Sequence, residues 1–184
     1  MDFNLNDEQR QIYEYGGQLA QQFDNAYWLD HARRHAFPQE MFRQIADDGF
    51  LGIMVPEEYG GAGGDFGHEA VLNMVPARLN MAFWANNNSV QSANVAHYIL
   101  AYGSEEHKQR WLPRMASGEL VGALAMTEPS TGSDVQANKT KAVKDGNAYR
   151  LSGQKTFISH GQHANLIIVA AKTDPGLGAK GVSM

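Results

Sequence analysis

A change of pattern near residue 120 constrains the fold of this 184-residue chain more than any other feature. Before it, apolar residues such as Ile12, Leu19 and Phe23 recur at helical spacing. After it, segments shorten, turns become frequent and β-branched residues gather. We therefore predict an α+β fold with two domains, an all-α domain at residues 1–120 and a β-domain at residues 121–184.

Local signals predict where several helices begin and end. Pro38 is a favoured first-turn residue, Gly49 is a typical stop, and Ser104 is a good N-cap. Residues 89–101 have the pattern of a nearly buried helix. Pro76 is expected to kink or break the helix that contains it.

Four segments of the second domain predict strands, with a hairpin turn at Asp145-Gly146. They are VGALAM (121–126), NAYRLSG (147–153), KTFIS (155–159) and NLIIVAAK (165–172). The last residues, GVSM (181–184), are typical of a strand that is just beginning. Because a few strands with open edges make a poor independent domain, we expect a truncated β-domain and hence a fragment of a longer protein.

Composition and charge exclude several classes of protein. The chain is 43% hydrophobic, which argues against disorder, and it has no cysteine for disulfides or thiolate metal sites. The net charge is −5 with no basic stripe, so nucleic acid is not expected as a partner. The longest apolar run, at 166–171, is far shorter than the roughly 20 residues of a membrane span, and we expect a soluble, cytoplasmic protein.

Charge is distributed unevenly between the two predicted domains. Residues 1–120 carry 8 Lys and Arg against 16 Asp and Glu, whereas residues 121–184 carry 7 against 4. The second domain therefore tolerates an anionic ligand, although chance clustering on a solvated face explains the same numbers.

Few residue patterns suggest catalysis or metal binding. The glycines at 60–64 lack the Lys and Ser/Thr of a phosphate-binding loop. His31 and His35 are expected on one helical face, but no third ligand accompanies them, so no metal is predicted. The segment 125–134 is rich in hydroxyl groups and glycine, and either an anion cradle or a turn without a ligand accounts for it.

Five groups of motifs occur along the chain in a consistent order. They are LNDEQ (5–9), FP (37–38) with GFLGI (49–53) and VPEEYGG (55–61), YGSEEHK (102–108) with LP (112–113), MTE (126–128) with GSD (132–134), and GQKTFIS (153–159). Together they resemble the acyl-CoA dehydrogenase family of flavoproteins, and the resemblance spans nearly the whole chain.

The resemblance implies a three-part fold and an activity. The parts are an N-terminal helical domain, a middle β-barrel-like domain and a C-terminal helical bundle that this chain lacks. The activity is the FAD-dependent α,β-dehydrogenation of an acyl-CoA thioester to the trans-2-enoyl-CoA, as in fatty acid β-oxidation. A glutamate takes the α-proton while hydride leaves the β-carbon for the flavin. That glutamate is expected downstream of residue 184, so no catalytic residue is predicted here, and Glu128 is not proposed as the base.

The resemblance also implies partners and an oligomeric state. Electrons pass to an electron-transfer flavoprotein, and the full-length protein is a homo-oligomer, either a dimer or a tetramer.

Carried over by position, two stretches of the chain would contact FAD. The expected contacts are Leu124, Met126, Thr127, Gly132 and Ser133 in the first stretch, and Phe157, Ile158 and Ser159 in the second. Ser133 would also lie near the CoA arm of the substrate. The sequence departs from the family pattern at Thr131, and it has Phe-Ile-Ser at 157–159 where Trp-Ile-Thr is frequent, but both changes keep the chemical type.

Other readings remain open at this point. Flavin oxidases and monooxygenases share the same fold, and a non-catalytic interaction module would need no cofactor. A flavoprotein purifies yellow, which separates it from such a module. Residues 81–88 lie in a region that borders the acyl pocket in the family, where Phe83 and Trp84 would either shorten the pocket or pack in the core.

Overall fold

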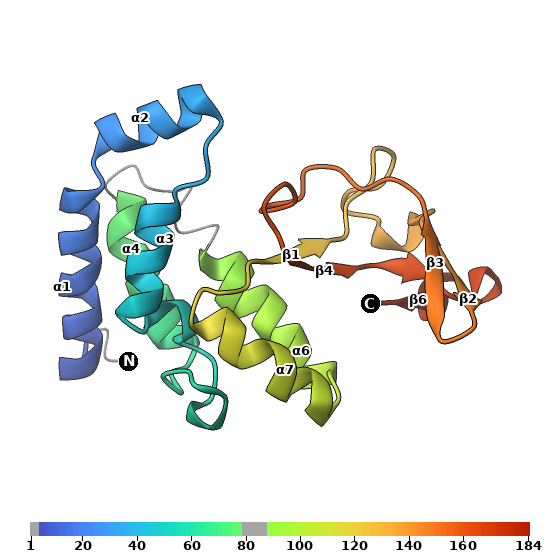
Figure 1. The fold of residues 1–184 in the computed structure, drawn as a ribbon, viewed down its shortest axis with the longest axis horizontal. Helices are drawn as coiled ribbons and strands as arrows, with labels where there is room; N and C mark the ends of the chain where they lie inside the picture. The colour runs from blue at the N-terminus through green and yellow to red at the C-terminus, as the bar shows by residue number, and fades with distance from the viewer. Residues whose placement is uncertain (1–3, 79–87) are drawn as a thin grey trace. The chain divides into compact units, whose positions relative to one another are not determined.

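The computed structural model describes residues 4–78 and 88–184, and the chain divides into two compact units, Met1–Val121 and Gly122–Met184. The first unit is helical and the second carries the strands (Figure 1). This confirms the predicted fold class, a helical part followed by a β-part. The described strands of the second unit form two small sheets and no closed barrel.

The helical unit contains α-, 3-10 and π-helices. The α-helices are α1 (Asp7–Gln22), α2 (Asn25–Arg34), α3 (Gln39–Asp47), α4 (Phe66–Arg78), α6 (His97–Tyr102) and α7 (Glu105–Ala116). The 3-10 turns are η1 (Phe50–Gly52) and η2 (Glu57–Tyr59), and the π-helix is η3 (Val90–Ala96).

The helix ends follow the local signals. The Asn6 side chain accepts the backbone N–H of Gln9 at 2.8 Å, and the Gln9 side chain accepts that of Asn6 at 3.2 Å, which completes a capping box at α1. Ser104 caps α7 by accepting the N–H of His107 at 3.2 Å. Gly49 follows α3 with a φ of 83°, a conformation that glycine adopts without strain.

The structure departs from two expectations for the helical unit and refines a third. Helix α4 runs through Pro76 to Arg78, so the proline does not break it. The nearly buried helix expected at 89–101 is confirmed, and its residues 90–96 are π-helical rather than α-helical. His35 is the left-handed C-cap of α2, with a φ of 50°, and therefore does not share a regular helical face with His31.

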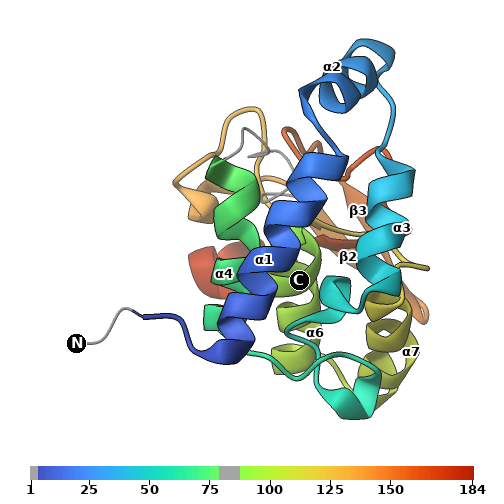
Figure 2. The same cartoon turned by 90° about the vertical axis from the view of Figure 1, so that its left-hand side faces the viewer.

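Two clusters of buried apolar side chains hold the helical unit together. The larger joins α1, α3 and η1 and contains Leu19, Phe23, Met41, Phe42, Ile45 and Leu51. The smaller joins α1 to α4, which lie side by side in Figure 2, and contains Ile12, Ile53, Val71 and Leu72. No helix among the described residues is both long and apolar enough to cross a bilayer.

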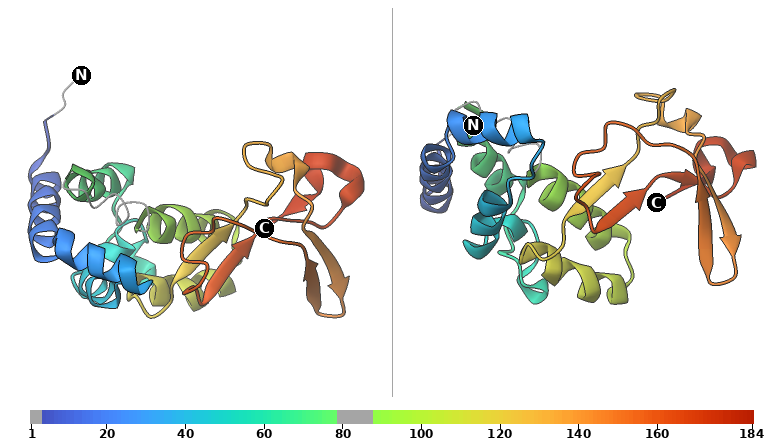
Figure 3. Two further views of the ribbon diagram at one scale, coloured as in Figure 1. Left: turned by 90° about the horizontal axis from the view of Figure 1, so that it is seen from above. Right: turned by 45° about the horizontal axis from the view of Figure 1, so that its top comes forward.

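The second unit holds a parallel pair of strands and a four-stranded sheet (Figure 3). In the pair, β1 (Gly122–Ala125) lies beside β4 (Leu166–Val169). The other sheet has the order β3 (Ala148–Ser152), β2 (Lys141–Asp145), β5 (Ala171–Lys172) and β6 (Val182–Ser183). The 3-10 turns η4 (Val135–Ala137) and η5 (Pro175–Gly181) complete the unit.

The strand predictions were partly right. The predicted hairpin is confirmed, but its two loop residues are Gly146 and Asn147, since Asp145 pairs with Ala148 at the ends of the antiparallel strands β2 and β3. Strand β2 was missed, because three of its five residues, Lys141, Lys144 and Asp145, are charged. The predicted strand at 165–172 divides at Ala170, whose carbonyl accepts the Asn138 side chain at 2.8 Å, into strands of different sheets.

Candidate functional site

The segment 155–160 is not the predicted strand but an irregular stretch tied to β1 and to the residues just after it. The Thr156 N–H donates to the carbonyl of Thr127 at 3.0 Å. Near the start of β1, His160 Nδ1 lies 3.0 Å from the carbonyl oxygen of Gly122. These two contacts place residues 157–159 alongside β1, so the two expected flavin-contacting stretches meet within one unit.

All eight residues expected to contact FAD retain solvent-accessible surface in this structure. Gly132, Ser133 and Phe157 are exposed, and the other five are partly buried: Leu124, Met126, Thr127, Ile158 and Ser159. Met126 and Thr127 accept hydrogen bonds from Lys155 and Thr156, the two residues just before the second stretch. Gly132 and Ser133 lie on the turn that follows Thr131.

Phe157 is the most unusual of these residues. Its side chain is 93% exposed, although an aromatic ring gains free energy by leaving water. Its φ of 55° lies in the left-handed region, as does the φ of 64° at His160. Such backbone conformations cost on the order of 1–3 kcal/mol each and cluster at ligand-binding positions.

The turn after β1 is closed by backbone hydrogen bonds. Glu128 and Thr131 exchange two N–H to carbonyl hydrogen bonds, each 3.0 Å long. Thr131 is buried, and its hydroxyl donates to the carbonyl of Ala137 at 3.3 Å. Thr131, the residue that departs from the family pattern, therefore anchors the turn. At the next position, Gly132, an added Cβ would meet no atom within 4 Å.

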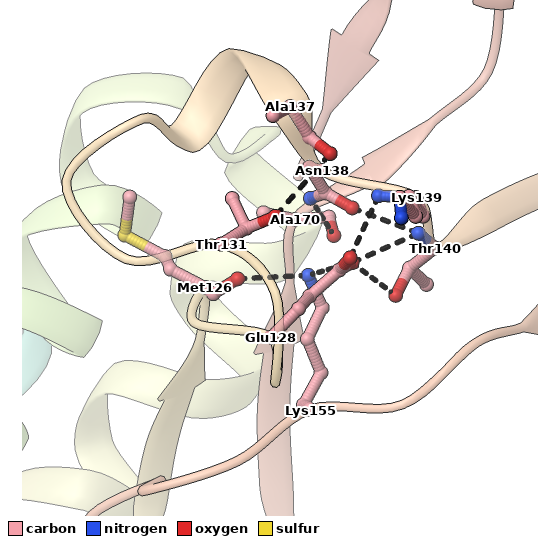
Figure 4. Close-up of polar contacts among 9 residues, drawn as sticks. All are labelled: Met126, Glu128, Thr131, Ala137, Asn138, Lys139, Thr140, Lys155 and Ala170. Atoms are coloured by element: carbon pink, nitrogen blue, oxygen red, sulfur yellow. Dashed lines mark hydrogen bonds and ion pairs between the residues drawn. The ribbon is translucent and has the colours of Figure 1, made fainter.

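Glu128 is buried, and its carboxylate accepts several hydrogen bonds, which Figure 4 draws. The carboxylate of Glu128 accepts hydrogen bonds from the Lys139 N–H at 2.7 Å, from the Thr140 N–H at 2.8 Å and from the Thr140 hydroxyl at 2.6 Å. Lys155 Nζ lies 3.1 Å from Glu128 Oε1 and donates to the Met126 carbonyl at 2.9 Å. Burial opposes ionisation of Glu128, but these donors outweigh it and lower the pKa of the carboxyl to about 2.

Lys155 was not among the residues that the sequence suggested for the site. Its partners lie 27 and 29 positions earlier in the chain, so no local pattern indicates the contact. The only available signal was its place in the GQKTFIS motif, two residues before Phe157.

Two further points concern the expected acyl-pocket region and metal binding. Residues 81–87 of the expected acyl-pocket region are outside the described residues. Among residues 4–78 and 88–184, no group of three or more His, Asp or Glu side chains is placed to hold a metal ion.

Comparison with known proteins identifies the family to which this arrangement belongs. The profile of the acyl-CoA dehydrogenase N-terminal domain matches residues 6–119, and that of the middle domain matches residues 123–184. The chain belongs to the acyl-CoA dehydrogenase family. The predicted family is thereby confirmed.

Individual relatives match along all or most of the chain. Acryloyl-CoA reductase (NADH) of Anaerotignum propionicum is 36% identical over 187 residues, which cover 100% of this chain and 46% of the relative. The crystal structure of an acyl-CoA dehydrogenase from Geobacillus kaustophilus has a TM-score of 0.91 and 36% identity, over 100% of this chain and 48% of that one. A glutaryl-CoA dehydrogenase from Mycobacterium smegmatis in complex with FADH2 has a TM-score of 0.84 and 29% identity, over 92% and 44%. This chain thus spans about half the length of these acyl-CoA dehydrogenase relatives.

Proposed function

We propose that this chain forms the FAD-contacting part of an acyl-CoA dehydrogenase, which converts an acyl-CoA thioester to the trans-2-enoyl-CoA. The observation that carries the proposal is the meeting of the two stretches, 124–133 and 157–159, on accessible surface of one unit. Family membership supports it, as does the relative that was solved with FADH2.

The residues present fit a flavin. The exposed ring of Phe157 offers an apolar, aromatic face to a flat ring system, and binding would remove that face from water. Thr127 is partly buried and Ser133 is exposed, and each has a hydroxyl that can donate a hydrogen bond. The open space at Gly132 lets a ligand approach the backbone closely.

Four of the expected flavin contacts have distinct parts in the proposed reaction. Thr127 and Ser159 would orient the flavin ring, Phe157 would pack on it, and Ser133 would bind phosphate of FAD or of the CoA arm. When bound, the flavin supplies a hydride acceptor for the β-carbon of the substrate. These residues would hold the cofactor in place and exclude water from one side of it.

Glu128 does not act as the base that removes the α-proton. Its oxygens already accept hydrogen bonds from Lys139, Thr140 and Lys155. With a pKa of about 2, its carboxylate is also a weak proton acceptor at neutral pH. We therefore do not assign the role of α-proton acceptor to Glu128.

The proposal extends to partners and context. The substrate is an acyl-CoA, whose phosphates suit the excess of basic residues at 121–184. Electrons would pass to an electron-transfer flavoprotein, and the whole protein would be a cytoplasmic homo-oligomer that works in fatty acid β-oxidation. These assignments rest on the family resemblance.

The test uses the purified full-length protein. We expect a yellow protein whose flavin absorbance bleaches anaerobically with an acyl-CoA and not with a nitroalkane. The Ser133→Ala variant removes a hydrogen bond to a charged group, so FAD affinity should fall roughly tenfold or more. Ser130→Ala, at the exposed tip of the same turn, is the matched control and should bind FAD normally.

Other outcomes would redirect the assignment. Bleaching by a nitroalkane alone would favour the oxidase or monooxygenase alternative. A folded, colourless protein that takes up no FAD would refute the proposal and favour a non-catalytic interaction module.

A further inference from the structure

Lys155 lies where the two expected flavin-contacting stretches meet. Its Nζ donates to the Met126 carbonyl at 2.9 Å and pairs with Glu128 Oε1 at 3.1 Å. The neighbouring Thr156 N–H donates to the carbonyl of Thr127 at 3.0 Å. These contacts set the distance between the first stretch and the backbone that leads directly into Phe157.

Glu128 extends this connection to a third segment. Its two carboxylate oxygens accept the N–H groups of Lys139 and Thr140, which come directly before strand β2. The hydroxyl of Thr140 adds a hydrogen bond of 2.6 Å. The turn after β1, the start of β2 and the segment before Phe157 are therefore joined at one carboxylate (Figure 4).

The ion pair between Glu128 and Lys155 is also unusually well buried. Their side chains are 4% and 12% exposed, and no other ion pair in the described part of the chain has both side chains below a fifth. Desolvation offsets much of the attraction in such a pair, so it adds little net stability over apolar side chains of similar size. Its distinctive contribution is a defined geometry, because both charges must be satisfied together.

We propose that Glu128 and Lys155 are positioning residues that set the spacing of the two flavin-contacting stretches. Both act through the backbone of neighbours, namely Met126 and Thr127 on one side and Phe157 on the other, rather than by touching the flavin. The inference rests on the proposed FAD site. It assigns a role to two residues that are not among the expected flavin contacts. A displacement of about 1 Å in such a site weakens function strongly.

The experiment compares variants of the full-length protein. Lys155→Met removes the charge and keeps most of the length of the side chain, which becomes one heavy atom shorter. Glu128→Gln keeps the shape, and the double variant removes both charges. Lys155→Arg is the conservative replacement. The matched control is Asp145→Asn, which breaks the exposed pair with Arg150 in the same unit, where N and O are 2.8 Å apart.

Three quantities are measured below the unfolding temperature. They are the dissociation constant of FAD from the apoprotein, the visible circular dichroism of bound flavin, and amide hydrogen exchange of residues 156–159 without flavin. For Lys155→Met we expect FAD affinity to fall roughly tenfold or more, an altered flavin spectrum and faster exchange. Arginine should restore part of the affinity, and the effect of Lys155→Met should be smaller in the Glu128→Gln background.

The outcomes separate this inference from the proposed function. A folded parent protein without flavin affinity refutes the proposed FAD site. If the parent binds flavin while Lys155→Met lowers only the unfolding temperature, with affinity, spectrum and exchange like those of Asp145→Asn, the positioning role is wrong. Should Lys155→Met not fold, Glu128→Gln and Lys155→Arg give the same three readouts.

Discussion

Replacing Glu128 by Gln should make the stability of the second unit less sensitive to acid. The glutamine has the shape of the protonated acid and cannot ionise. Parent and variant therefore resemble each other at low pH and differ at neutral pH. The difference between them isolates this carboxylate from all other acidic groups, which titrate in both proteins.

The magnitude follows from the pKa of the carboxyl group. Folding lowers it from its ordinary value of 4.5 to about 2. The shift corresponds to at most about 3 kcal/mol of folding free energy, and to roughly 2 kcal/mol after screening by water near this small unit. Because the folded pKa is lowered, the contribution is fully present above pH 4.5 and is lost as pH falls toward 2.

The assay is urea unfolding at several pH values, read by pulse-labelled hydrogen exchange of peptides from 122–184. At pH 7 we expect Glu128→Gln to be less stable by about 2 kcal/mol, with the gap closing between pH 4.5 and 2. Peptides of the helical unit should be unaffected. All three tryptophans, Trp28, Trp84 and Trp111, lie in residues 1–121, so their fluorescence is an independent control.

Two results would refute this reasoning. A stability gap that stays constant from pH 7 to pH 2.5 would mean that the lost hydrogen bonds, and not the ionisation of Glu128, account for the effect. Equal stability of the two proteins at pH 7 would mean that the donors around the carboxylate do not favour its charged form.

Three further predictions concern packing and backbone strain. Leu112→Ala empties a fully buried site in the helical unit and should cost about 2–5 kcal/mol in urea unfolding followed by tryptophan fluorescence. Gly61→Ala places a Cβ against the Val55 carbonyl and should destabilise more than Gly60→Ala, whose cost of about 1–2 kcal/mol comes only from its φ of 80°; equal losses would contradict the steric argument. Phe157→Gly should stabilise the flavin-free protein by about 1 kcal/mol in urea unfolding while weakening FAD binding in a titration, and a loss of stability would argue against strain.

Local sequence signals predicted the elements whose causes are themselves local. The capping residue Ser104 and the left-handed glycine at 49 act within one turn of the chain, and both predictions are confirmed. The hairpin between β2 and β3 is likewise local, because its loop consists of the two adjacent residues Gly146 and Asn147. The ordered motifs were sufficient to recognise the family.

The errors occurred where distant contacts outweigh local preference. The segment KTFIS has the composition of a strand, yet Thr156 donates its N–H to the Thr127 carbonyl and the chain runs irregularly beside β1. Pro76 was expected to kink or break the helix that contains it, yet α4 continues past this proline to Arg78. For KTFIS, strand propensity is a weak prior, because tertiary context overrides it.

The sequence by itself determined the two-part organisation, the helix caps and the family, because these depend on residue type and on spacing within a few positions. Only the tertiary structure decided how the site is built. It joined Glu128 to Lys155 across 27 positions, buried both, and left Phe157 exposed in a strained conformation two residues further on. The physical reason is that burial and charge pairing depend on which segments come together in space, and that information is spread over the whole chain.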